Sequence, residues 1–437
     1  MQPHLSSLRI AASDLNGRMR GKRLPADFMR KVENGAVRMP LSVLNVDIWG
    51  ADIDNNPLVF ETGDRDGYMQ PTGRGAVPMP WLSDDAFLMP ATMLKEDGDP
   101  FEGDPRRALE RVLERYAVRG WEVRAAAEME FYLVDDSGEF PVPVKNPRTG
   151  RPLVGANILS LAELDAFEPF FNSLYRACDM MDIPAQTAIS EVGTGQFEID
   201  INHKDALEAA DNAWLFKTMV KGIARQHNMA ATFMPKPFAG DAGTGLHVHF
   251  SVVDAEGNNV FDDGSEEGND TLRHAVAGCL EAMRASTLVF APHGPSYDRI
   301  VPGEHAPISV CWGYENRTAA IRIPAGPPAA RRIEHRIAGG DTNIYLHLAA
   351  VLGAAIDGIE RKATPPAPIT GNAYEGAHPE LVTNWNDAID LFENDPLIAQ
   401  IFHPRLIENL VMTKRQELRL LADIPPEDHW MTYLETV

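Results

Sequence analysis

The sequence predicts an α+β protein with a small β-rich domain over residues 1–103 and a larger domain over residues 104–437. Short runs of β-forming residues separated by turn signals fill the first part, for example residues 41–46. A clear helix start follows at Asp104, an N-cap acid directly before a proline. Beyond it, helix and strand patterns alternate without the regular rhythm of βαβ units, which favours α+β over α/β.

Caps, turns and periodicity place the elements in order. The glycines of residues 17–22 predict a hairpin turn, because the spacing there is one residue too short for a phosphate-binding loop. A helix from Asp104 to Arg119 ends at Gly120, and residues 136–156 form a loop rich in proline and glycine. Further helices are expected over residues 161–181, 204–228, 271–290, 343–361, 384–393 and 404–421.

Composition excludes several classes. The 437 residues suffice for a large core, and no apolar run approaches the roughly 18 residues of a membrane span or resembles a signal peptide. Three widely spaced cysteines fit a reduced cytoplasm better than a disulfide framework or a thiolate zinc site. The net charge of −23 disfavours nucleic acid as a partner, so the sequence predicts neither nucleic-acid nor membrane binding.

Residues 127–133 organise the larger domain as an expected strand. Side chains alternate faces in a strand, so Glu128 and Glu130 share one face roughly 7 Å apart, while Met129 and Phe131 turn into apolar packing. Adjacent carboxylates raise each other's pKa, so a fold keeps both ionised only beside cations. Alone, such a pair is more typical of a solvated strand face; similar charged positions further along the chain argue against that interpretation.

A second strand is expected after the Gly-Thr-Gly turn at residues 243–245. There His247, His249 and Ser251 alternate with apolar residues, the pattern of a half-buried strand. His247 can ligate a metal, and His249 and Ser251 can reach a phosphate, although two histidines in this pattern are usually not a ligand pair. The chain has no H-E-x-x-H motif, so a zinc hydrolase of that kind is not indicated.

Arginines recur at related spacings. Arg332, Glu334 and Arg336 share a strand face, which is also the pattern of a structural ion pair. Arg317 and Arg322 lie five residues apart, so a turn between them would let both reach one polyphosphate; two surface arginines are the alternative.

Glu191 and Glu198 bracket a glycine turn that lets two carboxylates converge, unless they are solvated loop residues. Together the chain offers five glutamates and one histidine, hard ligands that suit Mg²⁺ or Mn²⁺. Arginines beside them suit phosphate and carboxylate, so the set is typical of phosphoryl transfer.

At this point the chain resembles the glutamine synthetase superfamily over nearly its whole length. The motifs that carry the resemblance are Glu128-x-Glu130, Glu191 through Glu198, Phe233-Met234-Pro235-Lys236-Pro237, Gly243-x-Gly245-x-His247-x-His249-x-Ser251, Arg299-x-Val301-Pro302-Gly303, Asn316-Arg317 through Arg322-Ile323-Pro324, and Arg332-x-Glu334-x-Arg336.

The resemblance implies a curved antiparallel sheet, or split barrel, flanked by helices in residues 104–437. It implies two to three Mg²⁺ or Mn²⁺ ions, held at one site by Glu130, Glu191 and Glu198 and at the other by Glu128, His247 and Glu334. The substrate ATP would be held by His249, Ser251, Arg317, Arg322 and Arg332. Glutamate would be held by Gly243, Arg299 and Arg336.

Family members assemble into stacked rings, usually dodecamers, with active sites between subunits. The smaller domain lends acids to the next subunit, and Asp66 matches one such acid well while Asp47 matches another less closely. The implied reaction forms γ-glutamyl phosphate from glutamate and ATP, after which an amine displaces phosphate. This would be a cytoplasmic enzyme of nitrogen metabolism, with small-molecule substrates and copies of itself as partners.

The implied catalytic residues are Asp47, Asp66, Glu304, His305 and Arg317. Ammonia-using members carry a glutamate directly before an Ala-Pro pair, where this chain has His305, with Glu304 one residue earlier. A neutral imidazole is a good base near neutral pH but no negative seat for ammonium. The departure resembles relatives that use larger amines, notably γ-glutamylputrescine synthetases of polyamine catabolism.

Three alternatives stay open. Glu304 can serve ammonium after a one-residue shift, which would make the protein a glutamine synthetase. Monoalkylamines, ethanolamine or anilines can replace the polyamine. A non-catalytic relative would lose some metal ligands, and none of the six matched positions is lost here.

Overall fold

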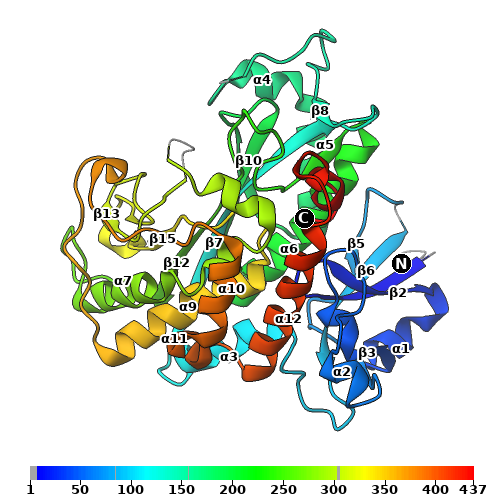
Figure 1. Ribbon diagram of the computed structural model, residues 1–437, viewed down its shortest axis with the longest axis horizontal. Coiled ribbons are helices and arrows are strands. Elements are labelled where there is room, and N and C mark those ends of the chain that lie inside the picture. Colours follow the sequence, from blue (N-terminus) through cyan, green and yellow to red (C-terminus); the bar gives the residue numbers. More distant parts are fainter. Residues whose placement is uncertain (1–6, 84, 156, 303–305) are drawn as a thin grey trace.

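The computed structural model describes residues 7–83, 85–155, 157–302 and 306–437, and it confirms the α+β class. Figure 1 shows two sheets, a small one at the N-terminal end of the chain and a large one at the centre of the molecule. Helices α6 (Ala206–Gln226) and α12 (Pro404–Leu421) lie between the two sheets in this view. No helix in these ranges combines the length and the apolar content that a membrane span requires.

The N-terminal sheet has the strand order β2-β1-β6-β4-β3, with β5 paired to β6. Its strands are β1 (Ser7–Ser13), β2 (Met19–Pro25), β3 (Val37–Pro40), β4 (Asp66–Pro71), β5 (Val77–Pro78) and β6 (Ala86–Leu94). The hairpin turn that joins β1 and β2 lies at residues 14–18, slightly before the expected run 17–22, whose last four residues belong to β2; the two strands pair antiparallel from Ser13 and Met19 outward. Short helical segments lie between these strands along the chain: η1 (Ala26–Phe28), α1 (Met29–Glu33), η2 (Leu41–Asn45) and α2 (Pro57–Phe60).

The β-type interpretation of residues 41–46 was wrong, because most of that run is the 3₁₀ helix η2. Its buried residues are Ser42, Leu44 and Asn45, a spacing that no strand face presents. The pairing of β3 with β4 ends with a hydrogen bond from Leu41 N–H to the carbonyl of Arg65, after which the chain turns into η2 and tertiary contacts override β propensity.

The large sheet follows the order β13-β14-β15-β12-β7-β10-β9, and β8 and β11 also pair with β7. Its strands are β7 (Glu122–Asp135), β8 (Val142–Pro143), β9 (Ala185–Ser190), β10 (Gln196–Asp205), β11 (Ala230–Thr232), β12 (Leu246–Val253), β13 (Trp312–Tyr314), β14 (Ile321–Ile323) and β15 (Ile333–His335). All pairs in it are antiparallel except β13 with β14, as the curved antiparallel sheet of the resemblance requires.

Helices pack against the large sheet and against one another. They are α3 (Pro105–Ala117), α4 (Leu161–Ala166), α5 (Glu168–Met181), α6, α7 (Asp270–Met283), α8 (Thr287–Phe290), α9 (Ile344–Arg361), α10 (Trp385–Asn394), α11 (Pro396–Ile401), α12 and α13 (His429–Tyr433). Short 3₁₀ helices are η3 (Gly294–Arg299), η4 (Pro328–Ala330), η5 (Ala373–Glu375) and η6 (Pro426–Asp428). Asp104 caps α3 through its side chain, as expected.

Two expected helices are each divided in two. Residues 271–290 form α7 and α8, which are separated by a turn at residues 284–286. Residues 161–181 form α4 and α5, which meet at Phe167. Pro169 in the first turn of α5 has no N–H to continue the helical bonds of α4 and fits only where a new helix begins.

Candidate active site

Cross-strand register brings the predicted ligands together. In the large sheet Glu130 lies opposite Glu198, and Glu128 lies opposite His247. On the next strand His249 lies opposite Glu334. Directly paired residues of antiparallel strands point to the same face, so residues from four separate strands form one polar surface. The opposite face is apolar, and Met129, Phe131 and Val248 are fully buried on it.

Glu128 is the centre of this surface. One of its carboxylate oxygens lies 3.0 Å from Nδ1 of His247, and the other lies 2.8 Å from Nε2 of His249. Nδ1 of His249 accepts a hydrogen bond from Arg332, so its Nε2 carries the proton donated to Glu128. Burial raises the pKa of Glu128, but these imidazole hydrogen bonds outweigh burial and lower it well below the usual range.

Glu130, Glu191 and Glu198 form the neighbouring half of the surface. Oε2 of Glu130 accepts hydrogen bonds from Gln196 and from the backbone of Gly245, each at 2.8 Å. Burial and then Glu130 raise the pKa of Glu191 to about 7. Burial, Glu130 and Glu128 raise the pKa of Glu198 to about 10. These carboxylates therefore repel one another and are suited to share bound cations.

Two groups of side chains have the geometry of a cation site. Ligand atoms of Glu128, His247 and Glu334 lie within 4.8 Å of one another, as do those of Glu130, Glu198 and His247. The donor set of carboxylate oxygens and one imidazole fits a hard divalent ion such as Mg²⁺ or Mn²⁺. Glu191 lies close enough to Glu130 and Glu128 for both carboxylates to raise its pKa.

Glu334 is fully buried and is held by two arginines. Arg322 donates to one carboxylate oxygen at 2.7 Å and Arg336 donates to the other. Burial raises the pKa of Glu334, but Arg336, and after it His249 and His247, outweigh burial and keep that pKa below its usual value. The ion pair considered for this motif is therefore present, and it directs the carboxylate toward Glu128 and His247.

A cavity of about 930 Å³ opens beside Glu128. Among the expected ATP-binding residues, His249, Ser251 and Arg332 line it, whereas Arg317 and Arg322 are not among its described lining residues. Arg317 lies in the turn before β14 and is exposed, near enough to Glu191 to oppose the rise in its pKa. The turn that was expected between Arg317 and Arg322 is present.

The expected glutamate-binding residues lie on the other side of the cluster. Arg299, at the end of η3, is almost fully buried and donates to the carbonyl of Ile337 at 2.6 Å. A Cβ added to Gly243 would lie 2.8 Å from the Arg299 side chain, so glycine is required at this close approach. Burial lowers the pKa of Arg299, while Glu130 and Asp341 oppose that shift.

Gln196 is a site residue that the sequence analysis did not identify. Its Nε2 donates to Glu130 at 2.8 Å and to the carbonyl of Gly243 at 3.0 Å, while its Oε1 accepts from the backbone of Gly193. Asp200 was also missed; it lies opposite Glu128 and lines the cavity. Both alternate with Glu198 along β10, so the period of two places them on the same face.

Two other expected residues, Asp66 and Asp47, are not at this surface. Asp66 lies on β4 of the N-terminal sheet, with its side chain about half exposed and 3.8 Å from Arg38. Asp47 is fully buried, and its oxygens accept from the backbone of Ala51 and from Gln416. Glu304 and His305 lie outside the described residues.

A family model described as the glutamine synthetase catalytic domain matches residues 102–433. The chain belongs to the glutamine synthetase family. It is 35% identical over 402 residues to gamma-glutamylputrescine synthetase PuuA of Escherichia coli (strain K12), covering 90% of this chain and 84% of that protein. It is 32% identical over 431 residues to the glutamine synthetase of Pyrococcus abyssi, covering 97% of this chain and 89% of that protein.

The solved structure of apo GmaS superposes with a TM-score of 0.84 at 27% identity, covering 99% of this chain and 97% of that one. This match confirms the fold over the whole chain. Members of this family are glutamate–amine ligases that act on small molecules and use ATP and divalent metals, and the clustered carboxylates and His247 can hold such metals.

Proposed function

We propose that this glutamine synthetase family enzyme joins the γ-carboxylate of glutamate to a polyamine such as putrescine, through γ-glutamyl phosphate. The observation that carries the ligase chemistry is the register of four strands, which gathers Glu128, Glu130, Glu198, His247 and Glu334 on one face. Their geometry suits two adjoining cation sites, for which we propose Mg²⁺ or Mn²⁺.

The residues proposed to bind ATP and those proposed to bind glutamate lie on different sides of the carboxylate cluster. His249, Ser251 and Arg332 line the cavity on one side of Glu128 and would bind ATP. Arg299 and the loop at Gly243 lie on the Glu130 side and would bind glutamate. Divalent cations held between them would neutralise the charge that two anionic substrates bring together. Arg317, Arg322 and Arg336 would add positive charge around the transferred phosphoryl group and the substrate carboxylate.

The amine preference rests on the loop at residues 302–307 and on a relative. His305 stands where ammonia-using members carry glutamate, and PuuA, a gamma-glutamylputrescine synthetase by name, shares 35% identity with this chain. Glutamine synthetase activity through Glu304 is the second candidate, favoured by 32% identity to the Pyrococcus abyssi enzyme.

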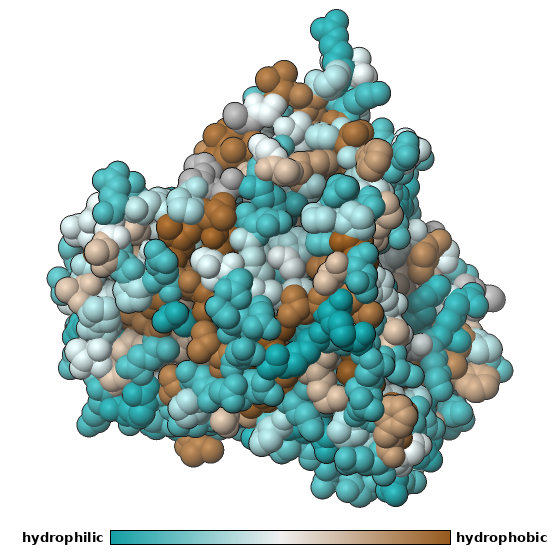
Figure 2. All heavy atoms as spheres, viewed as in Figure 1, coloured by the Kyte–Doolittle hydropathy of each residue, from teal (hydrophilic) through white to brown (hydrophobic). Residues whose placement is uncertain are grey.

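We also propose assembly into rings, with a dodecamer as the expected form. Val154, Ile158, Leu159 and Leu161 are each more than half exposed, with Val154 at 79%. Figure 2 shows apolar side chains gathered at the top of the view, over the part of the molecule that carries α4. Exposed apolar patches mark contact surfaces, and a second copy would cover this one. The exposed Asp66 carboxylate would then be free to join a neighbour's site, and residues 1–103 would form the domain that presents it.

Phosphate release with purified enzyme, ATP, Mg²⁺ and glutamate tests the function. Putrescine should support release better than ethanolamine, methylamine or ammonium at equal concentration. Faster release with ammonium would favour the glutamine synthetase candidate, and no release with any amine would refute the ligase. Size measurement by light scattering tests the rings.

The three cysteines are buried and unpaired, which supports a reducing cytoplasm as the compartment.

A further inference from the structure

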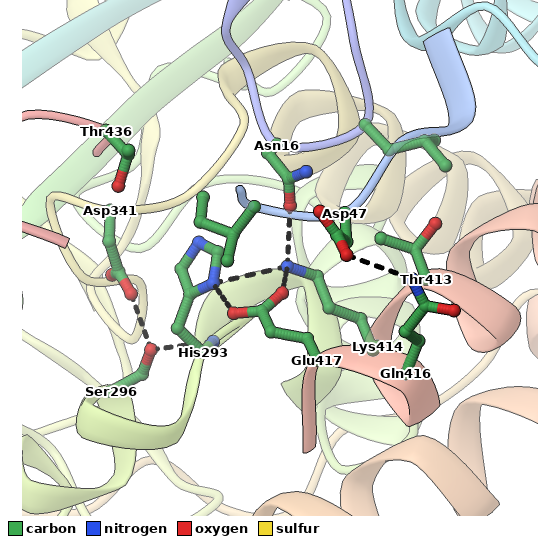
Figure 3. Close-up of polar contacts among 12 residues, drawn as sticks. Asn16, Asp47, His293, Ser296, Asp341, Thr413, Lys414, Gln416, Glu417 and Thr436 are labelled. Atoms are coloured by element: carbon green, nitrogen blue, oxygen red, sulfur yellow. Dashed lines mark hydrogen bonds and ion pairs between the residues drawn. The ribbon is translucent and has the colours of Figure 1, made fainter. Parts of the chain in front are cut away.

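A buried polar network joins three distant parts of the chain beside the glutamate side of the site. Lys414 and Glu417 on α12 are fully buried, and His293 directly before η3 is 1% exposed. Figure 3 shows the Lys414 ammonium at the centre, between Asn16, Glu417 and His293. Asn16 comes from the turn between β1 and β2, so the network connects the N-terminal sheet and the start of η3 to α12.

His293 is fixed strongly enough to hold η3 in place. Its Nδ1 lies 2.6 Å from Glu417, whose same oxygen accepts from Tyr433 at 2.8 Å. The carboxylate is ionised, because Lys414 and His293 outweigh burial and lower its pKa to about 2. The backbone N–H of His293 in turn donates to Ser296 Oγ at 3.0 Å, which secures the first turn of η3.

From Ser296 the contacts continue toward the candidate glutamate site. Ser296 Oγ donates to Asp341, as Figure 3 shows, and Asp341 is 1% exposed. In a 3₁₀ helix, residues three apart project from the same side, so Ser296 and Arg299 face the same way. Asp341 is accordingly close enough to Arg299 to favour its charged form against burial.

Residues 337–341, which end at Asp341, accept hydrogen bonds from η3 at two positions. Arg299 donates to Ile337 at the start of this segment and Ser296 donates to Asp341 at its end. The same segment follows directly on Arg336 and bonds to the glycine turn of the site, with Leu246 N–H donating to Ala338 at 2.9 Å. A shift of Asp341 would therefore move the surroundings of both expected substrate-binding arginines.

We propose that Ser296 and Asp341 are positioning residues for Arg299, and that His293, Glu417 and Lys414 anchor them to α12. Ser296 and Asp341 contact each other and act on the substrate only through Arg299. The inference rests on the proposed function, because it takes the ligand of Arg299 to be the carboxylate of glutamate. A guanidinium grips a carboxylate in two parallel hydrogen bonds, and that geometry tolerates little displacement.

Steady-state kinetics of Ser296→Ala and Asp341→Asn test the proposal. Both variants should raise the KM for glutamate about tenfold or more, because displacement of a binding group by an ångström is that costly. The KM for ATP should stay within twofold of wild type, since His249, Ser251 and Arg332 lie on the other side of Glu128. Ser296→Ala removes the hydrogen bond itself, whereas Asp341→Asn removes the negative charge beside Arg299 and keeps an oxygen that can accept from Ser296.

Asp211→Asn is a matched control. Asp211 is a buried carboxylate held by Arg106 and Tyr345, so it should lower thermal stability without changing the KM for glutamate. If Asp341→Asn fails to fold, Ser296→Ala alone decides. An unchanged KM for glutamate, or equal rises for glutamate and ATP, would overturn the positioning role. A wild-type enzyme inactive with glutamate and every amine would instead overturn the proposed function, and the inference with it.

Discussion

Gln196→Met should weaken metal binding at the Glu130 side of the site without unfolding the protein. Gln196 is 1% exposed, and its amide nitrogen holds Glu130 at 2.8 Å and the carbonyl of Gly243 at 3.0 Å. Methionine has a similar length and no donor, so the change removes these hydrogen bonds while it fills the same space.

The expected loss of metal affinity follows from the negative charge of Glu130, to which Gln196 donates. A hydrogen bond to an ionised group contributes about 1.5–3 kcal/mol, and every 1.4 kcal/mol is about tenfold in affinity. Loss of the bond to Glu130 should therefore weaken Mn²⁺ binding by about 10- to 100-fold, which agrees with the usual effect of removing a group that orients a metal ligand. The bond to Gly243 adds a smaller effect on the glutamate side.

Calorimetric titration of Mn²⁺ into the nucleotide-free protein measures this directly. The control is Gln416→Met, because Gln416 is also buried and binds Asp47 and the carbonyl of Asp52, in contact with the N-terminal part of the chain. Both variants should lose thermal stability, and only Gln196→Met should lose metal affinity. An affinity within twofold of wild type in a folded Gln196→Met protein would refute the reasoning.

Three further outcomes are expected. Glu417→Gln should destabilise the protein by about 3 kcal/mol at neutral pH, because the folded pKa of Glu417, about 2, lies well below the unfolded value near 4.5. This stabilisation is present above pH 4.5 and is lost as the pH falls toward 2. Urea unfolding should therefore show the difference in unfolding free energy between variant and wild type shrinking between pH 4.5 and pH 2. Gly245→Ala should reduce Mn²⁺ affinity at least about tenfold by calorimetry, because its Cβ would lie 2.8 Å from Glu130 and 3.0 Å from His247; unchanged affinity would show that the turn can move aside. Arg332→Met should weaken ATP binding about tenfold while the KM for glutamate stays constant. The reason is that Arg332 lines the cavity beside Glu128 and donates a hydrogen bond to His249. A larger effect on the KM for glutamate would contradict the assignment of Arg332 to ATP.

The sequence predicted which of the expected ligands share a strand face, because strand geometry is regular. A period of two placed Glu128 with Glu130, and His247 with His249, on one face before any partner strand was known. The same period also marks Gln196, which was overlooked because an amide carries no charge to draw attention. What periodicity cannot give is the order of strands, and only the register places His247 opposite Glu128.

Buried contacts between distant segments were beyond the sequence for a different reason. The helical period places Lys414 on the buried side of α12, three or four residues from Leu410 and Glu417, but Asn16 is 398 positions away and no local pattern identifies it as the partner. Asp47 illustrates the same limit: the resemblance offers it to a neighbouring subunit, whereas within this chain it accepts hydrogen bonds from Ala51 and Gln416. Its role in a neighbour's site stays a prediction that would require those bonds to open.

A structural role and a functional role are compatible for the same charged residue. Glu334 forms the expected ion pair with Arg336 and a second one with Arg322, which the motif did not predict, and its ligand atom still lies within 4.8 Å of those of Glu128 and His247. Ion pairing orients the carboxylate, which a metal ligand also needs, so one arrangement serves both purposes. A charged residue in this sheet therefore cannot be assigned to stability or to function from its own strand alone, because the neighbouring strands determine which partners it has.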